Sequence, residues 1–303
     1  MLEASRIKNN MSRDRILYNG KLAIPEEVKL NLNNRAFRYG DGLFETMRMF
    51  EGKMPFLELH LERLQTGIDM LQLDLPIANH GIEYWQYEIR RIVKYYHQKY
   101  PKQAKNYRMR LTVFRNDGGY YTPSTNGASY ILEVERLKTS MFDWNEKGLT
   151  IDIFRKVNLD KGRLNNLKTA NGLPYVLASL FKKDKGVDDV LLLNNKERIV
   201  ESTHSNVFFI KNNTLITPAL GEGCTAGTTR KIILGIGKEL GLKVKTTKCE
   251  INILKNVDEV FLSNAIRGIQ WVRKFKKKRY EHRVSKAIYL KMNKLIDNSK
   301  IEI

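Results

Sequence analysis

Residues 186–218 read GVDDVLLLNNKERIVESTHSNVFFIKNNTLITP. Short apolar runs alternate here with the pairs Asn194-Asn195 and Asn212-Asn213, which favour turns. The pattern predicts a meander of four strands, at 187–193, 199–203, 206–210 and 214–216. A β-rich core is therefore expected in the second half of the chain.

The residues on either side of this meander add helices and further strands. A helix is expected just after Lys168, marked by Leu173, Val176, Leu177, Leu180 and Phe181, and another over 227–240. Strands are expected at 149–154, 243–247 and 259–262. An amphipathic last helix carries Val284, Ile288, Met292 and Leu295 on one face. Together these elements predict a larger, β-rich domain over 148–303.

The first half of the chain predicts a small α/β domain over 1–137. Asn19-Gly20 favours a hairpin turn within 15–32, and strands are expected at 43–50, 107–114 and 128–137. Two helical stripes lie between the strands: Leu57, Leu61, Leu64, Ile68 and Leu71, then Ile82, Trp85, Ile89, Ile92 and Tyr96. Residues 138–147 show neither period and predict an interdomain linker. The fold class expected is α+β with two domains.

Composition narrows the class of protein. The chain has 303 residues, of which 42% are hydrophobic and 28% charged, so it can bury a sizeable core and is not expected to be disordered. Cys224 and Cys249 are too few for a disulfide framework, which favours a reducing compartment. No run approaches the roughly 20 apolar residues needed to span a bilayer. We expect a cytoplasmic protein without membrane partners.

The chain is strongly basic, with 53 Lys and Arg against 33 Asp and Glu, a net charge of +20. Such a charge attracts anionic small molecules, nucleic acids and acidic membranes alike. The densest run, RKFKKKRY at 273–280, interleaves aromatic and cationic residues, as phosphate-backbone-binding segments do. A solvated turn before the last helix is the preferred interpretation, because charge runs are usually exposed. A nucleic-acid-binding module is kept as the alternative from another class.

Two segments could carry chemistry. GEGCTAGTTRKIIL, at 221–234, places glycines and threonines directly before a helix, where unpaired N–H groups and the helix dipole bind phosphate. A plain glycine-rich helix entry is the alternative, and a Walker loop is excluded because Arg230 follows the threonines. Lys168 lies in NNLKTANGLPYVLASL; it becomes a Schiff-base candidate if a phosphate seat, a carboxylate and an arginine converge on it.

Five blocks follow one another over about residues 15–272. They are NRAFRYGDGLFETMRMFEG at 34–52 continued by PFLELHLERL at 55–64, NNLKTANGLPYVLAS at 165–179, the stretch 186–218, GTTR at 227–230, and FLSNAIRGI at 261–269. In type and order they resemble the class IV aminotransferases, fold type IV enzymes that use pyridoxal 5′-phosphate. The resemblance implies a homodimer whose partner loops help to close each site.

The resemblance also implies roles for individual residues. Lys168 would form the Schiff base and move the α-proton, and Glu201 would pair with the pyridinium nitrogen. The remaining cofactor ligands would be Arg63, Thr228, Thr229, Asn264 and Ala265. The substrate contacts would be Phe37, Arg38, Tyr39, Arg115, Tyr121 and Arg267, with Thr225 and Ala226. No metal site is expected.

Three details bear on the reaction. KTANGLPYVLA matches D-amino-acid transaminases and 4-amino-4-deoxychorismate lyases without a gap, and Ser263-Asn264-Ala265 is more similar to the lyases. RNDGGYYTP at 115–123 resembles the lyases' glycine-rich loop but lacks its further Arg, and Phe37 stands where D-amino-acid transaminases place Tyr. The leading expectation is a lyase-like enzyme. The alternative is a transaminase of branched-chain or D-amino acids with 2-oxoglutarate.

Overall fold

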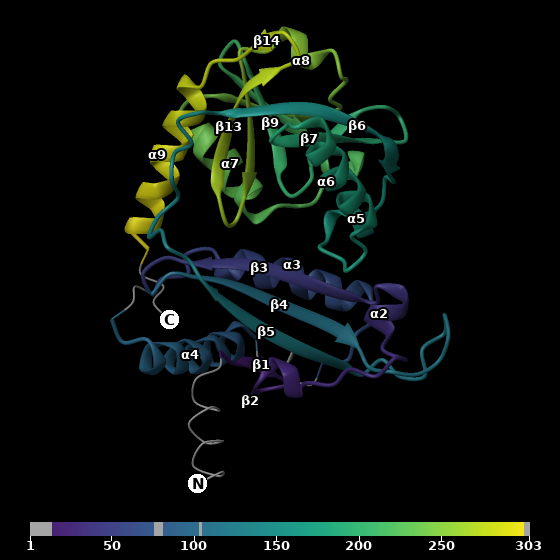
Figure 1. Ribbon diagram of the computed structural model, residues 1–303. Coiled ribbons are helices and arrows are strands. Elements are labelled where there is room, and N and C mark those ends of the chain that lie inside the picture. The colour runs from purple at the N-terminus through teal and green to yellow at the C-terminus, as the bar shows by residue number, and fades with distance from the viewer. Residues whose placement is uncertain (1–13, 76–80, 103–104, 300–303) are drawn as a thin grey trace. The chain divides into compact units, whose positions relative to one another are not determined.

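The computed structural model describes residues 14–75, 81–102 and 105–299, which divide into two compact units. Of the described residues, unit 1 holds those up to Met54 together with those of Leu64–Ser140, and unit 2 holds Pro55–Arg63 together with those from Met141 onward. The two units are described separately (Figure 1). The boundary of one unit therefore falls after Ser140, and the linker over 138–147 stays a prediction.

Unit 1 contains a five-stranded antiparallel sheet. Its strands, in the order β2-β1-β5-β4-β3, are β1 (Ile16–Tyr18), β2 (Lys21–Ala23), β3 (Gly42–Met49), β4 (Tyr107–Arg115) and β5 (Ala128–Arg136). Asn19 and Gly20 both have positive φ, 46° and 76°, at the turn between β1 and β2. The predicted hairpin is thus confirmed, because left-handed backbone at both turn positions matches the twist of the strands.

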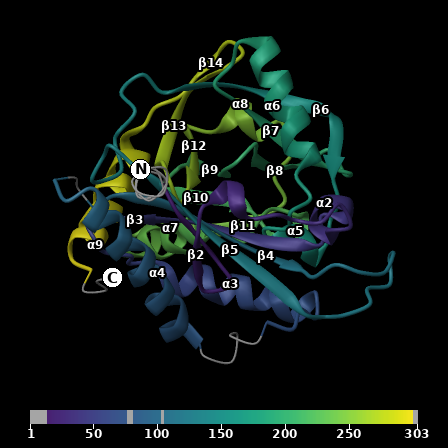
Figure 2. The same ribbon diagram turned by 60° about the horizontal axis from the view of Figure 1, so that its bottom comes forward.

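Two long helices pack on one face of this sheet (Figure 2). They are α3 (Leu57–Met70), which begins in unit 2 and ends in unit 1, and α4 (Gly81–Lys99); η1 (Pro25–Glu27) and α2 (Arg35–Tyr39) are short. A Cβ on Gly67 of α3 would lie 2.7 Å from the Leu43 side chain, so only glycine allows this approach. Trp85 of α4 packs edge-on against Tyr130, with ring centroids 5.1 Å apart. The apolar core of unit 1 therefore lies between this face and the helices.

Unit 2 is built on a sheet that closes on itself. Its strands run in the order β11-β10-β9-β12-β13-β6-β7-β8, and β8 also pairs with β9. They are β6 (Leu149–Leu159), β7 (Asp189–Asn194), β8 (Ile199–Ser202), β9 (Asn206–Lys211), β10 (Thr214–Pro218), β11 (Lys243–Thr247), β12 (Glu259–Asn264), β13 (Gly268–Phe275) and the short β14 (Lys278–Arg279) on β13. The predicted four-strand meander is confirmed as β7 to β10. Six strands form a closed ring around a core that includes Leu191, Val207, Phe209 and Val272.

The helices of unit 2 are α5 (Arg163–Asn166), α6 (Leu173–Lys185), η3 (Leu220–Glu222), α7 (Thr228–Glu239), α8 (Ile253–Asn256) and α9 (Arg283–Asp297). α6 turns Tyr175, Ala178 and Phe181 toward the buried residues of β6 and β7. Four of the five residues that predicted this helix are exposed: Leu173, Val176, Leu177 and Leu180. The pattern predicted the position of the helix correctly. The helix packs on the sheet through the opposite face, however, where the small side chain of Ala178 allows a close approach.

Two further expectations meet the structure differently. Leu295 of α9, predicted on the apolar face, is 37% exposed, whereas Ile296 is 1% exposed and completes that face. The basic run 273–280 covers the end of β13, a tight turn and β14, and Lys276, Lys277, Lys278 and Arg279 are exposed. It is therefore a solvated hairpin, as the preferred interpretation expected.

Within the described ranges, no helix combines the length and apolar character needed to cross a membrane.

A stacked aromatic pair should carry much of the stability of unit 2. Phe208 of β9 and Phe261 of β12 are both fully buried, with parallel rings 4.8 Å apart. Phe208→Ala should lower the free energy of unfolding by about 3–5 kcal/mol, because it leaves a cavity. Urea unfolding measures the loss. The control is Leu240→Ala, a residue 40% exposed, and an equal loss in both variants would contradict the packing described.

Candidate functional site

A buried carboxylate lies where the ring of strands closes. Glu201 of β8 pairs with Asn206 of β9 and is 3% exposed. Its carboxylate accepts hydrogen bonds from the Tyr175 hydroxyl at 2.6 Å and from the Thr225 amide at 2.9 Å. Burial raises the pKa of Glu201, and these donors and the positive charge of Lys168 oppose the rise. The hydrogen-bond donors Tyr175 and Thr225 are neutral, so the Glu201 carboxylate favours a cationic N–H group beside it.

Lys168 lies in the loop between α5 and α6 and is half-buried. The Asn166 side chain anchors this loop by donating to the carbonyls of Leu220 and Cys224, at 3.0 and 2.7 Å. The Asn166 carbonyl accepts from the Ala226 amide at 2.9 Å. The segment around Thr225 therefore touches both the lysine loop and Glu201, which brings the predicted Schiff-base lysine and the predicted acid into one region.

The segment predicted as an anion seat lies at the N-terminus of α7. Thr228 and Thr229 are buried, and the N-cap residue Gly227 has no side chain that could cap the helix. A Cβ on Gly227 would lie 2.0 Å from the Asn206 Oδ1 atom, so glycine is required there. Amide groups at such a terminus and the positive end of the helix dipole suit a phosphate.

Residues of α3 reach this helix terminus from within unit 2. The Arg63 guanidinium donates to the Ala226 carbonyl at 2.8 Å. The His60 Nε2 atom lies 3.3 Å from the Thr228 hydroxyl, and His60 is 3% exposed. Arg63, predicted from the sequence, therefore lies beside the anion seat and supplies positive charge there.

The loop between β12 and β13 is shaped by Asn264. Its Oδ1 atom accepts from the amides of Ile266 and Arg267, at 3.0 and 2.8 Å, and its Nδ2 group donates to the Ser205 hydroxyl at 2.9 Å. Both ends of the side chain are thus used within the protein. The loop is tied to the turn between β8 and β9, with Ala265 half-buried and Arg267 exposed.

The other predicted substrate contacts lie in unit 1. Arg115 is only 6% exposed and donates to Asp41 at 2.9 Å, to Asn126 at 2.7 Å and to the Leu71 carbonyl at 2.6 Å. Its guanidinium therefore connects three separate segments of unit 1 by hydrogen bonds. The same Asp41 carboxylate also binds Arg35, at 2.8 Å.

The aromatic residues of unit 1 are arranged differently from Arg115. Phe37 is 78% exposed and Tyr121 is 89% exposed. The rings of Tyr39 and Tyr121 contact each other, with centroids 5.4 Å apart. Arg35 supports them by donating to the carbonyls of the loop residues Gly118, Gly119, Tyr120 and Tyr121. The exposed rings of Phe37 on α2 and of Tyr121 on the loop held by Arg35 are therefore both at the surface.

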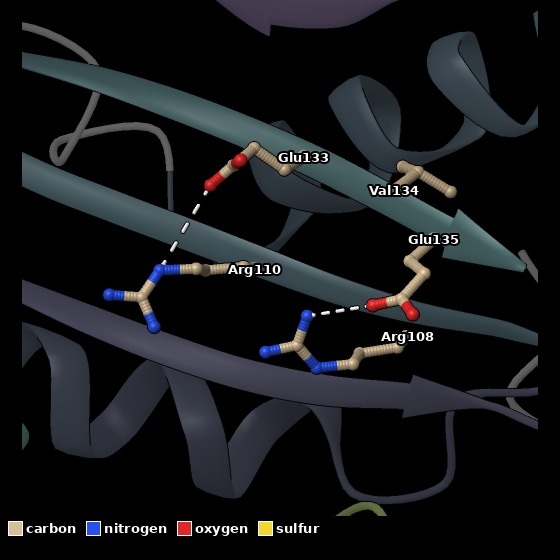
Figure 3. A pocket seen from close by; sticks show the side chains of 5 residues that line it. All are labelled: Arg108, Arg110, Glu133, Val134 and Glu135. Atoms are coloured by element: carbon tan, nitrogen blue, oxygen red, sulfur yellow. Dashed lines mark hydrogen bonds and ion pairs between the residues drawn. The ribbon is translucent and has the colours of Figure 1, made fainter. Parts of the chain in front are cut away.

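A small pocket lies on the polar face of the unit 1 sheet (Figure 3). It has a volume of about 140 Å³ and is lined by Arg108, Arg110, Glu133, Val134 and Glu135. Arg108 pairs with Glu135 at 2.9 Å, and Arg110 approaches Glu133 at 4.0 Å. Because each arginine faces a glutamate of the neighbouring strand, the pocket carries little net charge. The alternation in YRMRLTVFR could have indicated these two arginines.

Sequence reasoning also overlooked Tyr175 and His204 near Glu201. Tyr175 lies in the quoted block 165–179, and burial beside the Glu201 carboxylate raises the pKa of its phenol.

Cys224 and Cys249 are buried free thiols, and burial raises the pKa of each to about 12. Over the described residues, no group of three or more His, Cys, Asp or Glu side chains could hold a metal ion.

Comparison with known proteins agrees with this geometry. The family model for amino-transferase class IV matches residues 42–275. The chain is 26% identical over 256 residues to the aminodeoxychorismate lyase of Bacillus subtilis, which covers 83% of each chain. It is 24% identical over 257 residues to the D-alanine aminotransferase of Staphylococcus aureus, which covers 83% of this chain and 85% of that protein.

Among solved structures, the 4-amino-4-deoxychorismate lyase of Pseudomonas aeruginosa superposes with a TM-score of 0.77 and 26% identity, over 93% of this chain and 98% of that one. The family model spans most of the chain, and its match includes the lysine loop, Glu201 and the α7 terminus. This protein is therefore an enzyme of the class IV aminotransferase family, whose members have fold type IV and depend on pyridoxal 5′-phosphate.

Proposed function

We propose that the site in unit 2 binds pyridoxal 5′-phosphate and acts on an amino acid or a related amino-carboxylate. The observation that supports this is the buried Glu201 carboxylate, which accepts hydrogen bonds from the neutral donors Tyr175 and Thr225 and on whose pKa the positive charge of Lys168 acts. A protonated ring nitrogen would compensate that carboxylate. The α7 terminus with Thr228 and Thr229 would hold the phosphate, beside Arg63 and Ala265.

The donor set fits the cofactor at each of its three reactive parts. An amine, an acid and a phosphate seat are the groups that this cofactor needs, and Lys168, Glu201 and the α7 terminus supply them. When bound, the cofactor supplies an aldehyde that bonds to an amine and a ring that accepts an electron pair. Asn264 would act indirectly, because its side chain already shapes the loop between β12 and β13.

Each residue then has a defined task. Lys168 would act as the base that takes the proton from the substrate α-carbon onto its own amine. Tyr175 and Thr225 hold the Glu201 carboxylate in one orientation through their hydrogen bonds. Arg267 is exposed beside this site and offers a positive charge to a substrate carboxylate.

The substrate contacts in unit 1 are proposed in modified form. Phe37 and Tyr121 are exposed, Tyr39 is half-buried against Tyr121, and all three remain the proposed contacts. Arg115 is proposed as a positioning residue instead, because its guanidinium N–H groups already donate to Asp41, Asn126 and the Leu71 carbonyl.

The leading reaction is that of a 4-amino-4-deoxychorismate lyase, which releases p-aminobenzoate and pyruvate. The resemblance of Ser263-Asn264-Ala265 to the lyases supports this choice, whereas the block at 165–179 resembles lyases and D-amino-acid transaminases equally. The alternative is a transaminase that moves the amino group of a branched-chain or D-amino acid to 2-oxoglutarate. A cytoplasmic location stays a prediction, as does the exclusion of nucleic acid as a partner.

The lysine assignment can be tested by colour and trapping. The purified holoenzyme should show a yellow absorption band, and borohydride should fix the cofactor on the peptide containing Lys168. Lys168→Ala should prevent trapping and lower the turnover rate by at least about a hundredfold, because the acid–base group is lost. The control is Lys291→Ala, which removes an exposed lysine of α9 that pairs with Glu239 of α7. Trapping on another lysine would contradict the assignment.

The reaction can be decided with two assays on the same preparation. One supplies aminodeoxychorismate without an amino acceptor, and the other supplies D-alanine or a branched-chain amino acid with 2-oxoglutarate. We expect pyruvate and p-aminobenzoate in the first. Glutamate in the second with no pyruvate in the first would establish the transaminase instead.

We further propose a homodimer, which the family resemblance implies. The exposed apolar face of α6, formed by Leu173, Val176, Leu177 and Leu180, supports self-association. Contiguous apolar surface of this kind is uncommon on monomers and usually marks an interface.

Sedimentation velocity of the holoenzyme should report twice the mass of one chain. Leu177→Glu combined with Leu180→Glu should shift the protein toward the monomer, because charges would be buried in the contact. Leu290→Glu, at a 58% exposed position on α9, serves as the control. A wild-type protein that sediments as a monomer at micromolar concentration would disprove the dimer.

A further inference from the structure

Asn166, the last residue of α5, makes three hydrogen bonds to the single segment 220–226. Its side-chain Nδ2 group donates to the Leu220 carbonyl at 3.0 Å and to the Cys224 carbonyl at 2.7 Å. Its main-chain carbonyl accepts from the Ala226 amide at 2.9 Å. An uncharged side chain that donates two hydrogens from one nitrogen is a primary amide, so these contacts specify asparagine or glutamine.

The chain just before α5 lies against the same segment. A Cβ on Gly223 would be 2.4 Å from the Asp160 carbonyl oxygen, so glycine is required for this close approach. The Lys161 amine pairs with the Glu222 carboxylate at 3.1 Å, and Glu222 is 5% exposed. The stretch that contains α5 is therefore attached to the segment at both of its ends, and the course of the chain into the lysine loop is fixed.

The last residues of the segment hold the other parts of the site. The Thr225 amide donates to the Glu201 carboxylate at 2.9 Å, and the Ala226 carbonyl accepts from Arg63 at 2.8 Å. Two neighbouring amides thus have different partners, because that of Thr225 binds the acid and that of Ala226 binds Asn166. The segment therefore determines how far the acid lies from the lysine loop.

Asn166 acts on Lys168 through the main chain. Only Leu167 separates the two residues; its side chain is buried, and its amide donates to the Leu164 carbonyl at 3.1 Å. The main chain at Lys168 therefore has little freedom. Because the lysine side chain extends from that point, a shift of the main chain displaces the amine, and a misplacement of about 1 Å can cost roughly a hundredfold in rate.

We propose that Asn166 is a positioning residue: its side-chain amide fixes the main chain at Lys168 relative to the Glu201 carboxylate. This inference rests on the proposed function of the site. When the amide is removed, the acid keeps both of its donors and the anion seat keeps its arginine, whereas the lysine loop loses two contacts. The lysine chemistry should therefore be impaired while the ring and the phosphate of the cofactor still bind.

The coupling can be measured on the protein without cofactor. In Asn166→Ala, amide hydrogen exchange of Ala226 should accelerate about tenfold because its acceptor is less firmly held, whereas the amide of Thr225 should keep its rate because Glu201 still accepts from it. The matched control is Asn165→Ala, since that side chain donates within its own stretch of chain; it should change neither amide. An unchanged Ala226 amide, or equal acceleration of both, would overturn the proposal.

Two forms of the cofactor separate the lysine from the rest of the site. Pyridoxamine 5′-phosphate has no aldehyde, so its affinity reports the acid and the anion seat, and Asn166→Ala should bind it within about twofold of wild type. Pyridoxal 5′-phosphate added to the same variant should develop the yellow band about tenfold more slowly, because its aldehyde must meet the Lys168 amine. Turnover should fall about tenfold with KM changed by less than about threefold. Asn165→Ala should match the wild type in all three measurements.

Asn166→Asp is the second variant and decides the matter if Asn166→Ala does not fold. It keeps the size of the side chain but has lone pairs in place of both hydrogens, so it should show the same selective loss. Asn165→Asp is its control for the added charge.

The outcomes separate this inference from the proposed function. A yellow, active wild type whose Asn166 variants keep wild-type rates would overturn the role of Asn166 alone. A loss of pyridoxamine 5′-phosphate affinity as large as the loss of turnover would also overturn it, because it would indicate general disruption of the site. A wild-type protein that takes up no cofactor would overturn the proposed function and this inference together.

Discussion

The burial of the Glu201 carboxylate at the closure of the strand ring is the constraint on which the rest of unit 2 depends. Removing a carboxylate from water is costly unless its lone pairs are satisfied, and the protein commits Tyr175 from α6 and Thr225 from the α7 approach to that task. These contacts fix where α6 and the α7 loop lie relative to β8. The acid, the lysine loop and the anion seat are therefore positioned by the same few hydrogen bonds.

Side-chain hydrogen bonds in the turns of unit 2 also hold the loops around Glu201 in place. Asn264 uses both ends of its side chain, and Asn206 reaches Thr225, so that each loop around Glu201 is bound to the next. Such networks hold reacting groups in fixed geometry, which catalysis requires. Unit 1 uses the same principle, because Asp41 joins Arg35 and Arg115 and thereby supports the loop that exposes Tyr121. The two arginines therefore stabilise unit 1, and the loop that they support carries the exposed ring of Tyr121.

Some of the fold and of the site was predictable because the sequence signals are local. Asn19-Gly20, the glycine-rich approach to α7 and the block around Lys168 depend on neighbouring residues, and each predicted its element correctly. Arg115 shows where this reasoning ends, since an arginine in a matching motif has the same sequence signal whether it binds substrate or protein. Only its contacts with Asp41, Asn126 and Leu71 show that it is buried.

The sequence by itself determined the family, the order of most strands and helices, and the residue types available for the chemistry. The tertiary structure alone decided which faces are covered: α6 buries Ala178 and leaves Leu177 exposed, and α9 buries Ile296 in place of Leu295. It also decided that Thr203 lies between Asp189 and His204. The physical reason is that turn and helix preferences act over a few residues, whereas burial and hydrogen bonding depend on segments far apart in the chain.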